Sequence, residues 1–409
     1  LLIGQTNNNL AHLLMLKGEY GKAMNYLQIA SGLFDSVDDR VGIARVNADF
    51  GNLYFRQGKY EEAKQYFEQS IMIGVATRGT AGSAQIASNL GLTHMNLGNY
   101  QEAIAVQRSQ LRVSKRLSDK QGMASLYTNL GIVYLEKGEN EEALDCFEQG
   151  LVLSQELGNK QLKAIAIGSM GIVYVHQGDY EKAMECFLED LRLVEELGDK
   201  QGTAIALGLI GELHNVKGDF HKAIEYLQKN LMLCEELGYQ KGIAKAVNTL
   251  GDVFYFTKQY ERSKHYYERS IVIARNIKNR LVLGASLVEL GAVYIETEDF
   301  QALKEVSTEA LTIGEELGNS ELLFEAKVLS ARCYSFDGRE KEAQQLLNEA
   351  IFSTEEKDLL AYGYFQMWRI VPEDAKAYEK ALSLYKELYE RTPKYIFRER
   401  LEELKRAKD

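Results

Sequence analysis

A glycine recurs every 40 residues along most of this 409-residue chain, and this period limits the possible folds more than any other feature. The series has no insertion or deletion, and Ala11 and Ala331 extend it at either end of Gly51, Gly91, Gly131, Gly171, Gly211, Gly251 and Gly291. A second series follows seven residues later, with Gly18, Gly58, Gly98, Gly138, Gly178, Gly218 and Gly338. Repetition at a period of roughly 20 to 50 residues indicates units that are stable only when stacked on their neighbours.

Each repeat has the pattern of two helices joined by a turn. In residues 122–160, a first apolar stripe follows the spacing of one helix face: Leu126, Leu130, Val133 and Tyr134. Gly138 then supplies the left-handed residue that commonly ends a helix. A second stripe follows it: Ala143, Leu144, Phe147, Leu151 and Leu153. This repeated pattern therefore predicts an all-α solenoid of about nine helical hairpins over residues 1–355.

Gly131 lies inside the first predicted helix of its repeat, so a turn does not explain it. Glycine costs roughly 1 kcal/mol relative to alanine in a helix interior. We interpret the position as a place where the second helix approaches closely, with Ala143 as the small residue opposite. Closer packing then offsets the loss of helix propensity.

The order of residues in each repeat resembles the tetratricopeptide repeat. The family signature, a Leu-Gly pair followed by Tyr, Ala and Phe, is present as Leu130, Gly131, Tyr134, Ala143 and Phe147. It is present again as Met170, Gly171, Tyr174, Ala183 and Phe187. The period is longer than the usual repeat of about 34 residues, and the closing proline is absent. Both features resemble the longer-helix subclass of Pins-type scaffolds and bacterial peptide-receptor and regulatory arrays. The resemblance implies a right-handed superhelix in which the first helices line a concave groove.

The period ends after residue 355. A short apolar helix is predicted over residues 359–370, with Trp368 inside it and Pro372 after it. Two further helices are predicted, over residues 373–391 and from Pro393 to about Ala407. Residues 373–409 carry ten basic and nine acidic side chains, a density that suits a polar cap over the last repeat. We therefore expect residues 356–409 to be an irregular capping region, or alternatively a helix that couples to a further domain.

Charge and motifs exclude several classes of function. The net charge of −11 repels a phosphate backbone, so we expect no nucleic-acid partner. No apolar segment approaches the roughly 20 residues that span a bilayer, so we expect no membrane contact. The four cysteines form no CxxC pair and indicate a reducing compartment, which suggests a cytoplasmic protein. Metal-ligand and catalytic motifs are also missing. We expect no cofactor, no metal and no enzymatic activity.

The resemblance assigns groove positions at fixed offsets from the signature glycine. Toward the N-terminus these positions are mostly polar and basic: Asn8, Asn9, His12, Arg45, Asp49, Asn52, Arg56, Gln85, Asn89, Asn96 and Asn129. In the middle repeats they are mostly apolar: Leu92, Met95, Ile132, Leu135, Ile165, Ile172, Val175, Ile205 and Leu209. Toward the C-terminus they become acidic, with Glu212, Asp252, Glu289 and Glu296 and one exception, Lys245.

This groove predicts a scaffold that binds a peptide or an amphipathic helix of a protein partner. The alternative is a ligand-sensing regulatory module of a larger signalling protein of the cyclase, kinase or transcription-regulator type. Because the chain begins at Leu1 rather than Met, we expect it to be a fragment. Two alternatives stay open for the apolar groove positions of the middle repeats, which we call the apolar patch. The chain self-associates through this patch, or its own second helices cover it.

Overall fold

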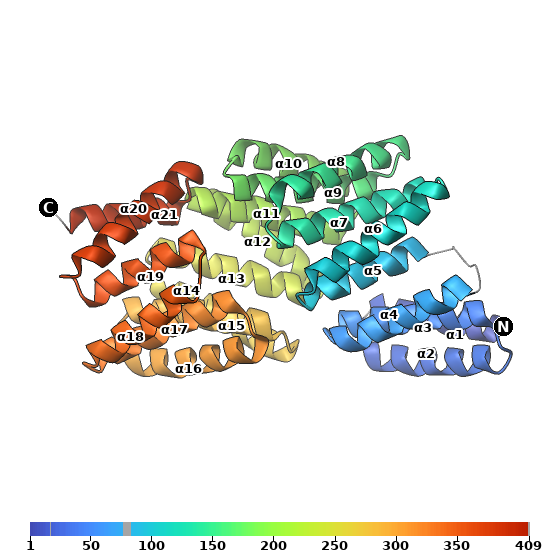
Figure 1. The fold of residues 1–409 in the computed structure, drawn as a ribbon, viewed down its shortest axis with the longest axis horizontal. Helices are drawn as coiled ribbons and strands as arrows, with labels where there is room; N and C mark the ends of the chain where they lie inside the picture. The colour runs from blue at the N-terminus through green and yellow to red at the C-terminus, as the bar shows by residue number, and fades with distance from the viewer. Residues whose placement is uncertain (17, 77–82, 408–409) are drawn as a thin grey trace. The chain divides into compact units, whose positions relative to one another are not determined.

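The computed structural model describes residues 1–16, 18–76 and 83–407, and its elements are all α-helices (Figure 1). The helices are α1 (Leu2–Leu16), α2 (Tyr20–Asp35), α3 (Arg40–Arg56), α4 (Tyr60–Ala76), α5 (Ser83–Asn96), α6 (Tyr100–Arg116), α7 (Lys120–Glu136), α8 (Asn140–Glu156), α9 (Lys160–Gln177), α10 (Tyr180–Glu196), α11 (Lys200–Lys217), α12 (Phe220–Glu236), α13 (Gln240–Phe256), α14 (Tyr260–Asn276), α15 (Arg280–Glu296), α16 (Phe300–Leu317), α17 (Ser320–Phe336), α18 (Glu340–Phe352), α19 (Lys357–Ile370), α20 (Ala375–Arg391) and α21 (Tyr395–Arg406). The predicted all-α class and the helical hairpins are confirmed.

Local chemistry fixes where the helices begin and end. The Asp119 side chain accepts a hydrogen bond from the backbone N–H of Gly122 at 2.9 Å, which satisfies one of the free donors at the start of α7. Gly138 has a φ of +82° in the turn before α8, a left-handed conformation that favours glycine. Lys258 and Glu298 take the same place in later repeats, with φ values of +58° and +57°. The hairpin geometry therefore persists where the turn glycine is lost.

The glycine inside the first helix makes room for an aromatic ring of the second. A Cβ atom built on Gly131 comes within 2.6 Å of the Phe147 ring, whereas Ala143 is buried elsewhere along α8. The close approach was predicted correctly, but the residue opposite Gly131 is Phe147 rather than Ala143. The same contact recurs between Gly51 and Phe67 and between Gly251 and Tyr267.

The chain divides into two compact units, Leu1–Val173 (unit 1) and Tyr174–Asp409 (unit 2). In unit 1 the first helices of successive hairpins contact one another, α1 with α3, α3 with α5 and α5 with α7. In unit 2 the same holds for α11, α13, α15 and α17. We call this row of first helices the inner layer of each unit. It carries the positions that were predicted to line the groove.

The C-terminal helices follow the predicted boundaries, but they cover more than the last repeat. α19 packs on α17 and α18 through a cluster that includes Phe324, Leu347 and Met367. α21 extends further back and contacts α11, beside which it lies in Figure 1. Its Tyr395 ring lies 4.8 Å from the Phe220 ring and 5.7 Å from the Phe256 ring. These ring contacts join the start of α21 to the start of α12 and the end of α13.

Candidate functional site

A chain of hydrogen-bonded polar side chains crosses the inner layer of unit 1. Asn8 on α1 donates from Nδ2 to Oδ2 of Asp49 on α3 at 2.7 Å. Asn52, one turn later on α3, donates from Nδ2 to the other Asp49 oxygen at 3.3 Å. Asn89 on α5 donates from Nδ2 to Oδ1 of Asn52 at 2.8 Å, and Gln85 donates from Nε2 to Oδ1 of Asn89 at 2.9 Å. We call these five residues the polar ladder.

Hydrogen bonding within the ladder holds its side chains in place and leaves them capacity for a ligand. An amide side chain has two N–H donors and an oxygen with two lone pairs. Asn52 and Asn89 each use one donor and one lone pair within the ladder. Each therefore retains one donor and one acceptor position. Burial raises the pKa of the Asp49 carboxyl, while hydrogen bonds from Asn8 and Asn52 act in the opposite direction.

The predicted apolar residues of unit 1 differ widely in exposure. Ile165 on α9 is 44% exposed, and four others are half-buried: Leu92, Met95, Ile132 and Ile172. Leu135 is only 7% exposed and belongs to the core cluster around Phe147. Its side chain thus has little surface left for a ligand. The apolar patch is therefore neither fully open nor sealed.

The other residues predicted to line the groove lie in both units and differ in exposure. In unit 1, Asn9 and Arg56 are exposed, and Asn129 is half-buried at the position on α7 equivalent to that of Asn89 on α5. Three predicted residues lie in unit 2: Val175 and Leu209 are half-buried, and Ile205 is 45% exposed. The residues that were predicted to line one groove are thus divided between the two units.

The acidic end of the predicted groove already has partners within unit 2. Glu296 accepts a hydrogen bond from Arg369 of α19 at 3.0 Å, and Glu212 pairs with Lys245 at 2.8 Å. The chain itself thus supplies basic partners for two of these acidic positions, Lys245 from α13 and Arg369 from α19. No repeat spacing relates Arg369 to Glu296, because the 40-residue period ends before α19.

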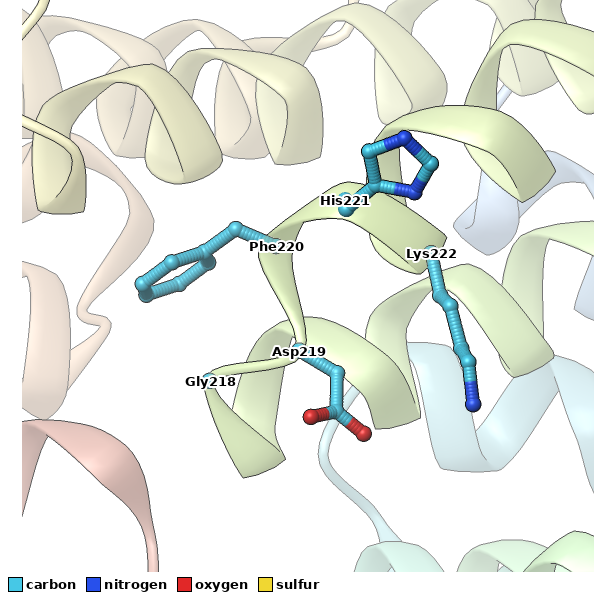
Figure 2. Close-up of a pocket in the computed structure, with 5 residues that line it drawn as sticks. All are labelled: Gly218, Asp219, Phe220, His221 and Lys222. Atoms are coloured by element: carbon cyan, nitrogen blue, oxygen red, sulfur yellow. The ribbon is translucent and has the colours of Figure 1, made fainter.

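A shallow hollow lies at the turn before α12, and Figure 2 shows the five residues that line it: Gly218, Asp219, Phe220, His221 and Lys222. Phe220 extends away from His221 and Lys222. Asp219 also lies 3.3 Å from Nδ1 of His214, whose pKa is lowered by burial. This neighbouring His–Asp pair has no nucleophile among the lining residues of the hollow. We assign it no catalytic role.

Among the residues that the structure describes, no helix is long and apolar enough to cross a lipid bilayer. No group of three or more His, Cys, Asp or Glu side chains in the same residues is arranged to hold a metal ion.

Comparison with known proteins agrees with the geometry. A comparison with curated proteins finds no match. Among solved structures, a Rap protein complexed with competence and sporulation factor is similar with a TM-score of 0.58 and 14% identity, covering 89% of this chain and 99% of that one. NprR in complex with its cognate peptide NprX gives a TM-score of 0.52 and 13% identity, covering 82% of this chain and 99% of that one.

A signal-transduction ATPase (STAND) protein with a tetratricopeptide repeat sensor, from Pyrococcus horikoshii, gives a TM-score of 0.52 and 18% identity. The match covers 80% of this chain and 50% of that one. A family model described as tetratricopeptide repeat matches residues 2–73, 82–156, 162–236 and 202–276, and a second model of the same description matches residues 48–112. With its period, its hairpins and these matches, the chain belongs to the tetratricopeptide-repeat family.

Proposed function

We propose that the inner layer of unit 1 binds an extended peptide segment of a protein partner, and that the chain acts by binding rather than by catalysis. The polar ladder is the observation that carries this proposal. Its amides are held by one another and retain donor and acceptor positions, as a peptide backbone requires. Because the rungs lie on three successive first helices, a peptide that crosses the layer meets amides at several points.

Apolar residues on α5 and on the following first helices of unit 1 supply the rest of the site. Leu92, Ile132, Ile165 and Ile172 retain partial exposure, and they would contact apolar side chains of the peptide. Burying about 400 Å² of apolar surface contributes on the order of 10 kcal/mol before association costs. Those costs leave a dissociation constant in roughly the millimolar to micromolar range. Exposed Asn9 and Arg56, together with half-buried Asn129, would contact the peptide at the edges.

Two similar structures support a peptide as the ligand. NprR is described in complex with its cognate peptide, and the Rap protein in complex with competence and sporulation factor. At these identities the likeness concerns the fold, so the choice of a peptide rests on the ladder. The polar ladder lies wholly within unit 1, and the proposal does not require Val175, Ile205 or Leu209.

A second candidate is a sensor module of a larger signalling protein. The match to half of a signal-transduction ATPase with a repeat sensor favours it. This candidate uses the same peptide site and adds an effector domain. The sequence that flanks the chain in its natural protein distinguishes the two.

A displayed library of random twelve-residue peptides, selected on the immobilised chain, tests the proposal. Enriched peptides are expected to bind with micromolar affinity by calorimetry and to lose at least tenfold affinity on Asn89→Ala. Gln149→Ala, an exposed position on the second helix α8, serves as the control and should leave binding unchanged. Enriched peptides that ignore Asn89→Ala, or a selection without enrichment, would overturn the proposal.

A further inference from the structure

One face of α1 exposes a row of apolar side chains. Ile3 is 67% exposed, Leu10 36% and Leu13 56%. Together with exposed Thr6, they lie at i, i+3, i+7 and i+10, which places them along one face of the helix. Leu2, which is 77% exposed, borders this row. We call Leu2, Ile3, Thr6, Leu10 and Leu13 the α1 stripe.

The equivalent row in later hairpins is buried against the preceding second helix. One repeat later, α3 carries four apolar residues at these positions: Ile43, Val46, Phe50 and Leu53. Val46 and Leu53 are fully buried there, in a core cluster with Phe34 of α2. On α7 the equivalent residues are also buried: Leu126, Leu130 and Val133. The α1 stripe thus has the composition of a packing surface between hairpins, but α1 packs on α2 and α3 and the stripe stays exposed.

The α1 stripe is separate from the surfaces that α1 uses within unit 1. Ala11 and Met15 are buried in the cluster that α1 shares with α2 and α3. Asn8 belongs to the polar ladder and donates to Asp49 of α3. None of the stripe residues belongs to the apolar patch either. A helix that packs on the stripe therefore covers neither the ladder nor the hairpin core.

The charge of α1 favours a second copy of this chain as the occupant of the stripe. α1 contains no Asp, Glu, Lys or Arg, whereas the whole chain has a net charge of −11. Two copies that meet along α1 therefore bring no like charges opposite each other, although acidic surfaces repel one another elsewhere. Alternating spacings of three and four residues also let two identical helices pack along one seam.

The helix that a second copy offers to the stripe is its own α1. Stacking in register with the repeats would instead lay the stripe on the last hairpin of the second copy, against α18. That surface is covered, because α19 packs on α18, and Leu347 and Ile351 lie in the cluster that these helices share. The two α1 stripes therefore meet about a two-fold axis, and the same residues form both sides of the contact.

We propose that the α1 stripe is a self-association surface, which pairs with the α1 stripe of a second copy of this chain. α1 has 15 residues and is about 22 Å long, so one stripe buries less than the roughly 800 Å² per partner of a standard stable interface. We therefore expect a reversible dimer with a dissociation constant on the order of 10–100 µM. The pairing does not use the polar ladder and does not depend on the peptide site proposed for unit 1.

Sedimentation equilibrium of the full chain, at concentrations on either side of this dissociation constant, tests the inference. Leu13→Glu places a charge on the stripe and is expected to raise the dissociation constant at least tenfold. Ile29→Glu is the matched control and should leave association unchanged, because Ile29 lies outside the stripe on α2 of the same hairpin and is 50% exposed. Thermal melts verify that both variants are folded. A chain that stays monomeric at every concentration, or a dimer that both variants weaken equally, overturns the inference.

Hydrogen exchange locates the contact without a substitution. The α1 amides of the wild-type chain should exchange at least twofold more slowly above the dissociation constant than below it, with those of α5 and α7 unchanged. Exchange of the α1 amides that does not depend on concentration overturns the inference. Slower exchange of α5 and α7 instead would assign the association to the apolar patch and would also overturn it. Peptide binding is measured separately through Asn89→Ala, so the failure of either proposal is distinguishable from the failure of the other.

Discussion

Gly131 offers the most direct test of how the repeats pack. Replacing it with alanine adds a methyl group at a point 2.6 Å from the Phe147 ring, closer than two carbon atoms can lie without movement. The ring must shift inside a core cluster that includes Val133, Ala143 and Val173. Gly32, inside α2, is the matched control, because a Cβ atom added there meets nothing within 4 Å.

The two substitutions share one contribution to stability and differ in another. Alanine in place of glycine in a helix interior stabilises by about 0.5–1 kcal/mol. Gly32→Ala should show this gain. Gly131→Ala should show the same gain minus an overpacking cost of about 1–3 kcal/mol. The free energies of unfolding of the two variants should therefore differ by about 1–3 kcal/mol, with Gly131→Ala the less stable.

Urea unfolding followed by circular dichroism measures this difference, and exchange of the α7 and α8 amides localises it. Because a repeat array need not unfold in one step, the exchange data decide which hairpin is affected. Shortening the facing ring should relieve the clash, so Gly131→Ala combined with Phe147→Leu should cost less than the sum of the single changes.

Equal stabilisation by Gly131→Ala and Gly32→Ala would refute the reasoning. It would mean that the recurrent glycine does not set the distance between the two helices of a hairpin. A strictly additive double variant would refute the narrower claim that Phe147 is the group that Gly131 accommodates.

Three further predictions concern charge and turn geometry. Burial raises the pKa values of Glu289 and Glu325, so the folded state binds more protons than the unfolded state. The melting temperature should therefore fall as the pH rises from about 5 to 8. In the Glu289→Gln/Glu325→Gln double variant, thermal melts should show a weaker dependence of the melting temperature on pH. Gly218→Ala should lower the melting temperature more than Gly138→Ala does. Both glycines have a φ of +82°, but a Cβ atom at Gly218 meets the Tyr395 ring, whereas one at Gly138 meets no described atom within 4 Å. Asp49→Ala should cost about 1–3 kcal/mol in urea melts, because it leaves the ladder amides without their acceptor, and Asp49→Asn should cost less.

The period of the sequence was enough to predict the hairpins and to place the residues of the polar ladder on the first helices. Asn52 and Asn89 lie where their offsets from the signature glycine place them. Their hydrogen bond could not be predicted, because it depends on how closely α3 and α5 stack and on side-chain rotamers. The burial of Leu135 could not be predicted either. Its offset from the signature glycine assigns it to the predicted groove, but packing around Phe147 buries it.

The C-terminal region was predicted less completely for a different reason. Apolar spacing and two prolines predicted the bounds of α19, α20 and α21. Which surface α21 covers depends on contacts between residues far apart in the chain, such as Tyr395 with Gly218. Without a repeat, nothing in the local pattern relates these residues.

Peptide binding by the inner layer of unit 1 can be tested with a matched pair of charge insertions. Ile165 on the first helix α9 is 44% exposed, and Met72 on the second helix α4 is 69% exposed. Titration of an enriched peptide should show at least a tenfold higher dissociation constant for Ile165→Asp and an unchanged value for Met72→Asp. Equal effects of the two changes, or a loss of binding with Met72→Asp alone, would contradict it.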